Sequence, residues 1–152
     1  NIKMKVLTER KAKKPESYTL YYCGSEPYTG HWKSYYKSKK LEWEGTIKNG
    51  KRNGLFKHYY ENGQLKEIVN WKLNIPYGVI KFYYECGQLC FEGILNEQGK
   101  REGIWKSYHN NGRLESVGNY KNGKRDGEWK VYDYSGIYQE TQYWNNGWRG
   151  YK

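Results

Sequence analysis

The sequence predicts an all-β protein: an elongated, twisted single-layer antiparallel meander built from successive β-hairpins. Three observations predict this fold class. A motif with a period of about 24 residues recurs along the chain. Each copy holds two turn signals separated by segments of about 6–7 residues, a length typical of strands. Within these segments apolar and polar residues alternate with the period of two that a strand requires.

The composition agrees with a sheet that lacks an aliphatic core. The 152 residues include 18 tyrosines and 7 tryptophans, so aromatic rings must supply most of the buried surface. No apolar run approaches the ~18 residues of a membrane-spanning helix, and no signal peptide is visible. A cytoplasmic location is favoured. Because the chain begins at Asn1 rather than Met, the alternative of a processed exported protein also stays open.

Catalytic, metal and cofactor sites are not expected. The odd number of cysteines, three, argues against a disulfide framework. The three histidines have no metal-ligand spacing with these cysteines. The chain has no nucleophile-elbow, zinc-protease or phosphate-loop motif. We therefore expect a protein that works by binding, with no cofactor.

Residues 1–29 precede the repeats and fit their pattern poorly. Alternation over residues 2–6 predicts a strand, residues 10–14 form a basic loop, and residues 18–22 predict a second strand. Two interpretations stay open. The segment is a capping hairpin, since repeat arrays need atypical ends, or it is a flexible basic arm.

The repeats occupy residues 30–152 and are aligned on a glycine that precedes a large apolar residue. Each unit reads approximately G-x-W-K-x-Y-Y-x-N-G-x-L-x-x-x-G-x-Y-x-N-G-K. The third unit has an insertion near Gln98, and the second has Leu73 to Pro76 where others have N-G-K-R. The five units begin at Gly30, Gly54, Gly78, Gly103 and Gly127.

The turn in the middle of each unit sets the predicted register. Asn62-Gly63 suits a two-residue type I′ turn, because both residue types tolerate positive φ. This turn places Tyr60 opposite Leu65, His58 opposite Glu67 and Phe56 opposite Val69. A second class of turn lies about eleven residues later, at Asn49-Gly50, Gln98-Gly99 and Asn122-Gly123.

The same register places large side chains opposite glycines in three units. Trp32 falls opposite Gly45, Ile80 opposite Gly93, and Trp105 opposite Gly118. A large side chain can cover the exposed backbone of a cross-strand glycine. These three pairs support the register independently of the period.

Alternation then sorts the repeated side chains onto two faces. The aromatic face is either simply the core or, where curling of the sheet does not hide it, a surface that binds a partner, since a single sheet has nothing else to cover it. The Lys–Tyr face is either a docking surface for an extended or anionic partner or a solvated surface with cross-strand pairs to Glu44 and Glu92. The aromatic face holds Trp32, Phe56, Ile80, Trp105, Trp129, Leu41, Leu65, Leu89, Leu114, Tyr138, Ile47, Trp71, Leu95, Tyr120 and Trp144. The Lys–Tyr face holds Lys33, Lys57, Lys81, Lys106, Lys130, Tyr35, Tyr59, Tyr83, Tyr108 and Tyr132.

Basic residues gather in the second class of turn and should line one edge of the sheet. This edge is a candidate site for phosphates of a nucleic-acid backbone or of an anionic lipid. Residues 144–151 are expected to form an edge strand open to pairing with another chain. The basic edge holds Lys51, Arg52, Lys100, Arg101, Lys124 and Arg125.

The unit motif, followed by Y-x-N-G-K-x-x-G, resembles the MORN-repeat variant family, as found in bacterial antitoxin-like proteins of the YwqK type. The resemblance spans residues 30–150. It implies an elongated sheet of hairpins, no catalytic residues, and roles in protein binding, toxin neutralisation, scaffolding or membrane-lipid attachment.

Two functional hypotheses follow. The first is a non-catalytic protein-binding module of the antitoxin or immunity type, whose partner is another protein, possibly a toxin, or a second copy of the chain. Because the net charge is +11, that partner should present an acidic surface. The second is a basic scaffold for an anionic surface, either phospholipid or a nucleic-acid backbone.

Overall fold

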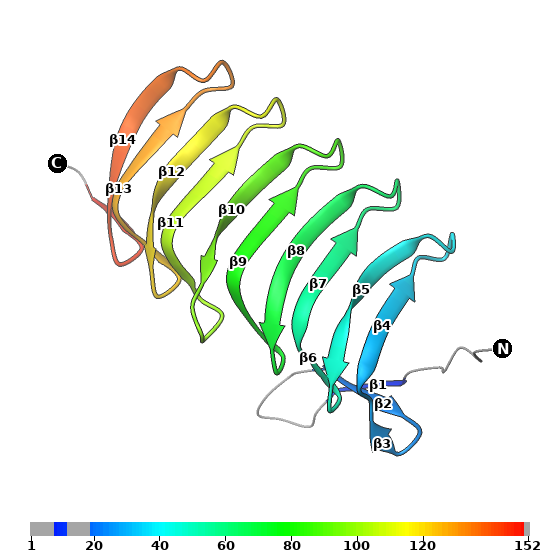
Figure 1. The fold of residues 1–152 in the computed structure, drawn as a ribbon. Coiled ribbons are helices and arrows are strands. Elements are labelled where there is room, and N and C mark those ends of the chain that lie inside the picture. Colours follow the sequence, from blue (N-terminus) through cyan, green and yellow to red (C-terminus); the bar gives the residue numbers. More distant parts are fainter. Residues whose placement is uncertain (1–7, 12–18, 151–152) are drawn as a thin grey trace.

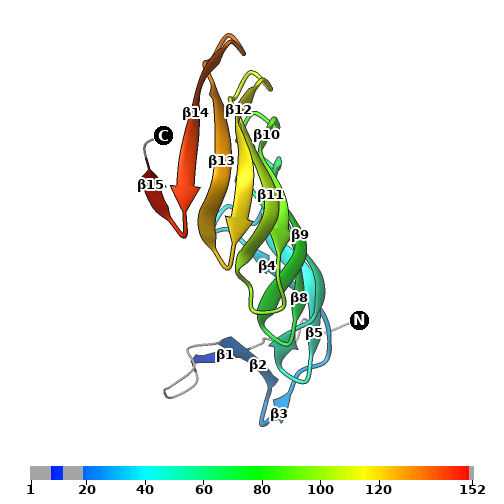
Figure 2. The same cartoon turned by 90° about the vertical axis from the view of Figure 1, so that its left-hand side faces the viewer.

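The computed structural model describes residues 8–11 and 19–150, and these residues form strands and turns without any helix. Twelve strands make one open antiparallel sheet in which strands consecutive in the sequence pair with each other, except that β6 pairs only with β5 and β7 pairs with β5 rather than β6. Figure 1 shows the hairpins side by side from β4 to β14, and Figure 2 shows the twist of the sheet. The predicted fold class is confirmed. The strands are β4 (Gly30–Tyr35), β5 (Leu41–Lys48), β6 (Lys51–Arg52), β7 (Gly54–Tyr59), β8 (Leu65–Lys72), β9 (Ile75–Tyr83), β10 (Leu89–Leu95), β11 (Arg101–Tyr108), β12 (Leu114–Lys121), β13 (Lys124–Tyr132), β14 (Tyr138–Asn145) and β15 (Trp148–Gly150).

Three short strands form a separate sheet beside the β4 end: β1 (Thr8–Lys11), β2 (Thr19–Cys23) and β3 (Glu26–Pro27). Tyr21 of β2 is fully buried, with its ring 5.1 Å from the ring of Trp32. Its hydroxyl accepts hydrogen bonds from Nε and Nη2 of Arg52, at 3.2 and 3.1 Å. Tyr21 thus packs against one end of the aromatic row. The strand predicted at residues 2–6 and residues 12–14 of the basic loop lie outside the described residues.

The mid-unit turns are three-residue loops, so the two-residue turn predicted at Asn62-Gly63 is wrong. The Tyr60 N–H donates to the Gln64 carbonyl, and the Gly63 N–H donates to the Tyr60 carbonyl. With φ of 90° at Gly63, this is a type I turn followed by a left-handed residue. The pairs of Phe56 with Val69 and of His58 with Glu67 are confirmed, but Tyr59 rather than Tyr60 lies opposite Leu65.

Type I′ turns occur instead at the opposite edge. Asn122 and Gly123 have φ of 51° and 83°, and their loop holds only these two residues. The insertion near Gln98 converts one such turn into a three-residue loop, closed by bonds between residues 96, 99 and 100. A further turn at Asn146-Gly147, which the sequence analysis missed, interrupts the edge strand expected over residues 144–151 and leaves β15 as the edge.

The extra residue in each mid-unit turn corrects the predicted faces. The pair of Ser107 with Ser116 is followed by the pair of Tyr108 with Leu114, so the register shifts by one residue at this point. Residues that lie opposite each other share a face of the sheet. Trp105 and Leu114 therefore lie on opposite faces, because a shift of one residue reverses the side chain. The rings of Tyr132 and Tyr138 lie 5.9 Å apart on the Lys–Tyr face. Five residues predicted on the aromatic face thus belong to the Lys–Tyr face: Leu41, Leu65, Leu89, Leu114 and Tyr138.

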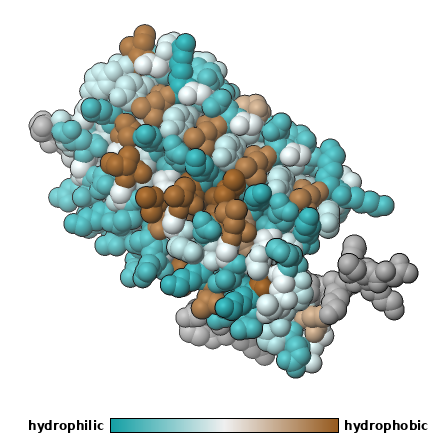
Figure 3. Space-filling model, viewed as in Figure 1, coloured by the Kyte–Doolittle hydropathy of each residue, from teal (hydrophilic) through white to brown (hydrophobic). Residues whose placement is uncertain are grey.

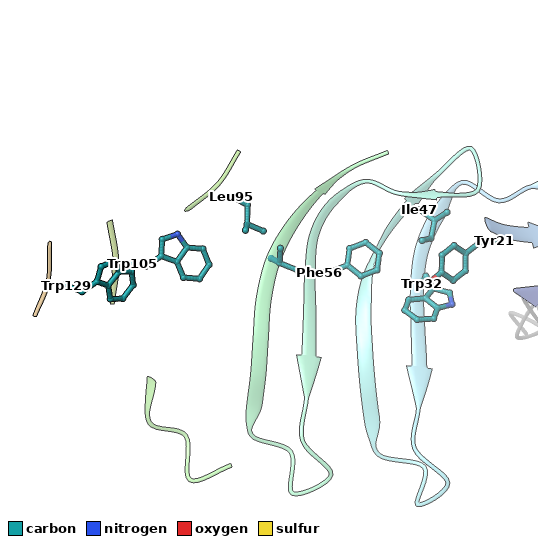
Figure 4. Close-up of a cluster of buried hydrophobic side chains, with 8 residues drawn as sticks. Tyr21, Trp32, Ile47, Phe56, Leu95, Trp105 and Trp129 are labelled. Atoms are coloured by element: carbon teal, nitrogen blue, oxygen red, sulfur yellow. The ribbon is translucent and has the colours of Figure 1, made fainter. Parts of the chain in front are cut away.

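The core is a single row of side chains on the aromatic face. Figure 4 shows the row running from Tyr21 through Phe56 to Trp129. The three predicted glycine pairs are confirmed. The ring that lies against each glycine, however, comes from the strand on its other side: Phe56 covers Gly45, Trp105 covers Gly93 and Trp129 covers Gly118.

The turn tips of successive units are joined by a ladder of hydrogen bonds. The hydroxyl of Tyr36 donates to the Tyr59 carbonyl at 2.6 Å, and Tyr60 donates to the Tyr83 carbonyl at 2.7 Å. The next unit repeats the bond from Tyr84, and Nε2 of His109 lies 3.1 Å from the Tyr132 carbonyl. This contact holds each unit to the next at the edge farthest from the aromatic row.

Candidate functional site

The seven aromatic residues predicted to bind a partner all lie in one row, but they differ in exposure. Trp32, Phe56, Trp105 and Trp129 are buried, because neighbouring rings pack edge to face or tilted along the row. Trp71, Tyr120 and Trp144 are half-buried. The four buried rings therefore act as core, and the half-buried rings are the part of the row that a partner can reach.

Three arginines of the predicted basic edge lie over this row. The Arg125 guanidinium carbon is 4.1 Å from the Trp129 ring centroid and 5.0 Å from that of Trp144. Arg101 lies in the same way over Trp105 and Tyr120, at 4.6 and 5.2 Å.

Arg52 covers Trp43, Phe56 and Trp71 at 5.5, 5.5 and 4.8 Å. Guanidinium groups at these distances are attracted to ring faces. Arginines over aromatic rings therefore form part of the surface on this side of the sheet.

The strand pairing across the second class of turn explains why the arginine and the lysine of each basic pair lie on opposite faces of the sheet. Arg52 pairs with Ile47, and Lys51 pairs with Lys48, so adjacent basic residues point to opposite faces. The sequence carried this signal, since Ile47 was already assigned to the aromatic face. The lysines at this edge that are exposed are Lys100 and Lys124, whereas Lys51 is half-buried.

A row of side chains crosses the sheet on the Lys–Tyr face. Every second residue of this row is a lysine, contributed by β4, β7, β9, β11 and β13. Glu44 lies between Lys33 and Lys57, with N–O distances of 3.5 and 4.0 Å, and Glu92 lies 3.4 Å from Lys81. Beyond Glu92 the intervening residues are uncharged. Neither Lys106 nor Lys130 forms an ion pair with any residue in the described part of the chain.

Two tyrosines of this face donate hydrogen bonds to the same glutamates. The Tyr59 hydroxyl donates to Glu44 Oε1 at 2.6 Å, and the Tyr108 hydroxyl donates to Glu92 Oε1 at 2.9 Å. Burial, followed by the hydrogen bond to the carboxylate, raises the pKa of both phenols to about 12. The Tyr59 hydrogen bond in turn lowers the pKa of Glu44.

Apolar side chains are also exposed on the Lys–Tyr face. Leu55, Val79, Ile94 and Ile104 have 46%, 51%, 50% and 58% of their surface exposed. Figure 3 shows hydrophobic residues gathered across the middle of the sheet. Two hollows of about 320 and 290 Å³ lie beside these residues and beside Glu44 and Glu92.

His58 is a structural residue of the aromatic face. Its ring stacks on Trp43 with centroids 3.8 Å apart and planes within 8°. Burial, together with Lys66 and Arg52, lowers the pKa of His58 to about 4, so the ring is neutral at pH 7. Its Nδ1 lies 3.9 Å from Glu67 Oε2, but a neutral ring forms no ion pair there.

Among the described residues no group of His, Cys, Asp and Glu side chains is placed to hold a metal ion. In that same part of the chain we find no helix with the length and apolarity needed to cross a bilayer. What repeats from unit to unit is a hairpin with a ring or isoleucine on one face and a lysine on the other.

The model of the MORN repeat variant family matches residues 28–49, 52–73, 101–122 and 125–147. The chain belongs to the MORN repeat variant family. Each match includes one of the unit glycines, and the unmatched stretch over residues 74–100 contains Pro76, which stands where other units have a basic residue, and most of the third unit. In the structure that stretch still contributes β9 and β10 to the MORN sheet.

The MORN repeat is usually a non-catalytic binding module, and no enzyme family is identified for this chain. No curated protein matches it. The family therefore agrees with a binding role and leaves the partner to be argued from the two faces.

Proposed function

We propose that this MORN protein is a non-catalytic protein-binding module whose docking surface is the arginine-covered aromatic face. The observation that carries the proposal is the placement of Arg52, Arg101 and Arg125 over rings of a sheet on which the described residues place no second layer. Arginine and aromatic residues are the types most enriched at binding hot spots. Half-buried Trp71, Tyr120 and Trp144 supply apolar contact area between the cations.

The partner that fits this face is a protein with an acidic surface, since the chain carries a net charge of +11. We propose that the chain acts as an antitoxin or immunity-type protein and neutralises this partner by occlusion. Membership of the MORN repeat variant family supports a binding role. The resemblance of the unit motif to antitoxin-like proteins of the YwqK type supports the antitoxin role. Neutralisation by occlusion needs no catalytic group.

Co-expression with the product of the neighbouring gene tests this proposal. We expect the two proteins to co-purify and the neighbour to harm cells that lack this chain. A neighbour that neither binds nor harms cells would contradict the antitoxin role.

A pair of charge-reversed variants then tests the face. Arg101→Glu/Arg125→Glu and Lys106→Glu/Lys130→Glu make the same change of charge on the same two strands, β11 and β13, but on opposite faces. We expect the arginine variant to lose partner binding and the lysine variant to retain it. Loss in the lysine variant alone would move the docking surface to the Lys–Tyr face.

A second candidate function is binding to an anionic surface through the Lys–Tyr face. The observation that favours it is that Lys106 and Lys130 are exposed, flank Val117 and form no ion pair within the described residues. Vesicles of anionic phospholipid and a duplex DNA are the probes, in sedimentation and gel-shift assays. We expect binding that weakens steeply as salt rises and is lost in Lys106→Glu/Lys130→Glu. Salt-independent binding would exclude this mechanism.

A further inference from the structure

One position of the aromatic face changes from unit to unit, and it sets the surroundings of each arginine. In every unit the residue on the strand before the second turn pairs across that turn: Ile47 with Arg52, Trp71 with Pro76, Leu95 with Arg101, Tyr120 with Arg125, and Trp144 with Arg149. The variable position lies four residues before the first member of each pair. It is occupied by Trp43, Glu67, Phe91, Ser116 and Glu140.

In the three units that have both an arginine and a large or acidic side chain at this position, that side chain contacts the arginine. The unit of Glu67 has Pro76 in place of the arginine. The Arg52 guanidinium carbon lies 5.5 Å from the Trp43 ring centroid, and that of Arg101 lies 5.8 Å from the Phe91 ring centroid. In the last unit Nη2 of Arg149 lies 3.0 Å from Glu140 Oε2 and 3.1 Å from Oε1. The side chain at this position therefore fills the space beside the guanidinium.

Ser116 breaks this rule, because its side chain is too small to fill that space. A hollow of about 110 Å³ results, bounded by Arg101, Arg125, Trp105, Trp129, Tyr120 and Ser116. Ser116 is buried, with 8% of its surface exposed, and its hydroxyl lies 2.7 Å from that of Ser107 on the next strand. The hollow thus has an aromatic wall, two hydroxyl groups and two guanidinium groups.

We infer that this hollow receives a carboxylate side chain of a partner protein, which contacts Arg125 as Glu140 contacts Arg149. The inference rests on the proposed function and names the chemistry of the partner group. It follows from the equivalence of the two units: the last unit supplies its own carboxylate at this position, and the unit of Ser116 leaves the place open.

The chemistry of the hollow favours a carboxylate over a neutral amide. Neither Arg101 nor Arg125 forms an ion pair with any described residue, and no carboxylate lines the hollow. A guanidinium binds a carboxylate by two parallel hydrogen bonds, and such charge-assisted bonds strengthen where aromatic walls exclude water. Because one of the paired Ser107 and Ser116 hydroxyls donates to the other, one hydroxyl proton of the pair is left to donate to the carboxylate.

The test is a nuclear magnetic resonance titration of the full chain with N-acetyl-glutamate N-methylamide. The matched neutral probe is N-acetyl-glutamine N-methylamide, and inorganic phosphate is a third. We expect saturable shifts of the Arg125 Nε–H and Trp129 indole N–H signals with the glutamate probe, and binding at least about tenfold weaker with the glutamine probe. Equal responses to the two amides, or tighter binding of phosphate, would overturn the inference.

Variants at Ser116 supply a second readout that does not depend on loss of fold. In Ser116→Glu the new carboxylate should contact Arg125, close the hollow, abolish the response to the probe and leave the melting temperature equal to or above that of the parent. Ser116→Ala keeps the hollow and should bind the probe within a few-fold of the parent. Unchanged probe binding in a folded Ser116→Glu variant would sink the inference.

The same variant separates this inference from the proposed function. If the natural partner binds the parent and the Ser116→Glu variant equally well, the hollow is not part of the interface and only the inference fails. If the glutamate probe binds as expected but no protein partner exists, the proposed function fails and the carboxylate site stands.

Discussion

The ring of Trp129 lies directly against the Cα of Gly118 on the neighbouring strand, in the space that a Cβ atom would occupy. The same relationship joins Trp105 to Gly93 and Phe56 to Gly45. In the unit where the large ring is replaced by Ile80, the glycine is replaced by Val69. A ring and a glycine thus occur together because the ring occupies the space that a Cβ atom of the cross-strand residue would fill. This close contact with the backbone buries the rings although they lie on a single sheet.

Gly118→Ala should therefore destabilise the protein by about 1–3 kcal/mol, because the methyl group forces the Trp129 ring away from the sheet. Gly150→Ala is the matched control, since its Cβ would meet only one atom, at 3.9 Å. Urea unfolding followed by tryptophan fluorescence measures both. The double variant Gly118→Val/Trp129→Ile copies the Val69–Ile80 unit and should be more stable than Gly118→Val alone. Equal stability of Gly118→Ala and the parent would refute the account.

Tyr60→Phe removes one rung of the hydrogen-bond ladder that joins the units. The Tyr83 carbonyl then loses its 2.7 Å partner, and we expect a loss of about 0.5–1.5 kcal/mol in the free energy of unfolding. Tyr35→Phe is the control, because Tyr35 is exposed and its hydroxyl forms no hydrogen bond with a described residue. If both variants lose the same stability, the ladder contributes nothing.

The strand meander, the glycine pairs and the row of rings could all be predicted from the sequence, because each rests on a local period repeated five times. The error at Asn62-Gly63 arose because asparagine–glycine suits two kinds of turn: a two-residue type I′ loop, and a three-residue loop that ends in a left-handed glycine. Only the pairing beyond the turn distinguishes them. One misplaced residue moved Leu114 and its equivalents to the wrong face.

The arginine cover was missed for a different reason. Because basic turn residues are usually exposed, the sequence predicts Lys124 and Arg125 to form one patch. Strand alternation separates them, since Arg125 pairs with Tyr120 on the aromatic face and Lys124 pairs with Lys121. The hollow at Ser116 was beyond sequence reasoning, because it depends on which side chains reach Arg125 in space.

The raised pKa of Tyr59 and Tyr108 predicts a pH dependence at the alkaline end. In the folded state both phenols keep their protons to about pH 12, whereas unfolded tyrosines lose theirs near pH 10. Because the unfolded state binds fewer protons above pH 10, stability should fall as pH rises from 10 to 12. Absorbance titration at the tyrosinate band should show late-titrating phenols, with Tyr59 and Tyr108 among them. In Glu44→Gln one of them should titrate earlier, since the carboxylate no longer accepts its hydrogen bond; an unchanged curve would contradict this assignment.

The lowered pKa of His58 predicts that the folded protein also loses stability at acid pH. The folded imidazole takes up its proton only near pH 4, but an unfolded histidine does so near 6.5. Below pH 6.5 the unfolded state therefore binds more protons, and stability should fall as pH falls from 6.5 towards 4. His58→Gln should flatten this part of the pH profile, because it removes the imidazole whose pKa is lowered. Proton resonance titration of the three histidine rings checks the cause directly, and a His58 ring that titrates near 6.5 would show that its stack on Trp43 does not keep it neutral.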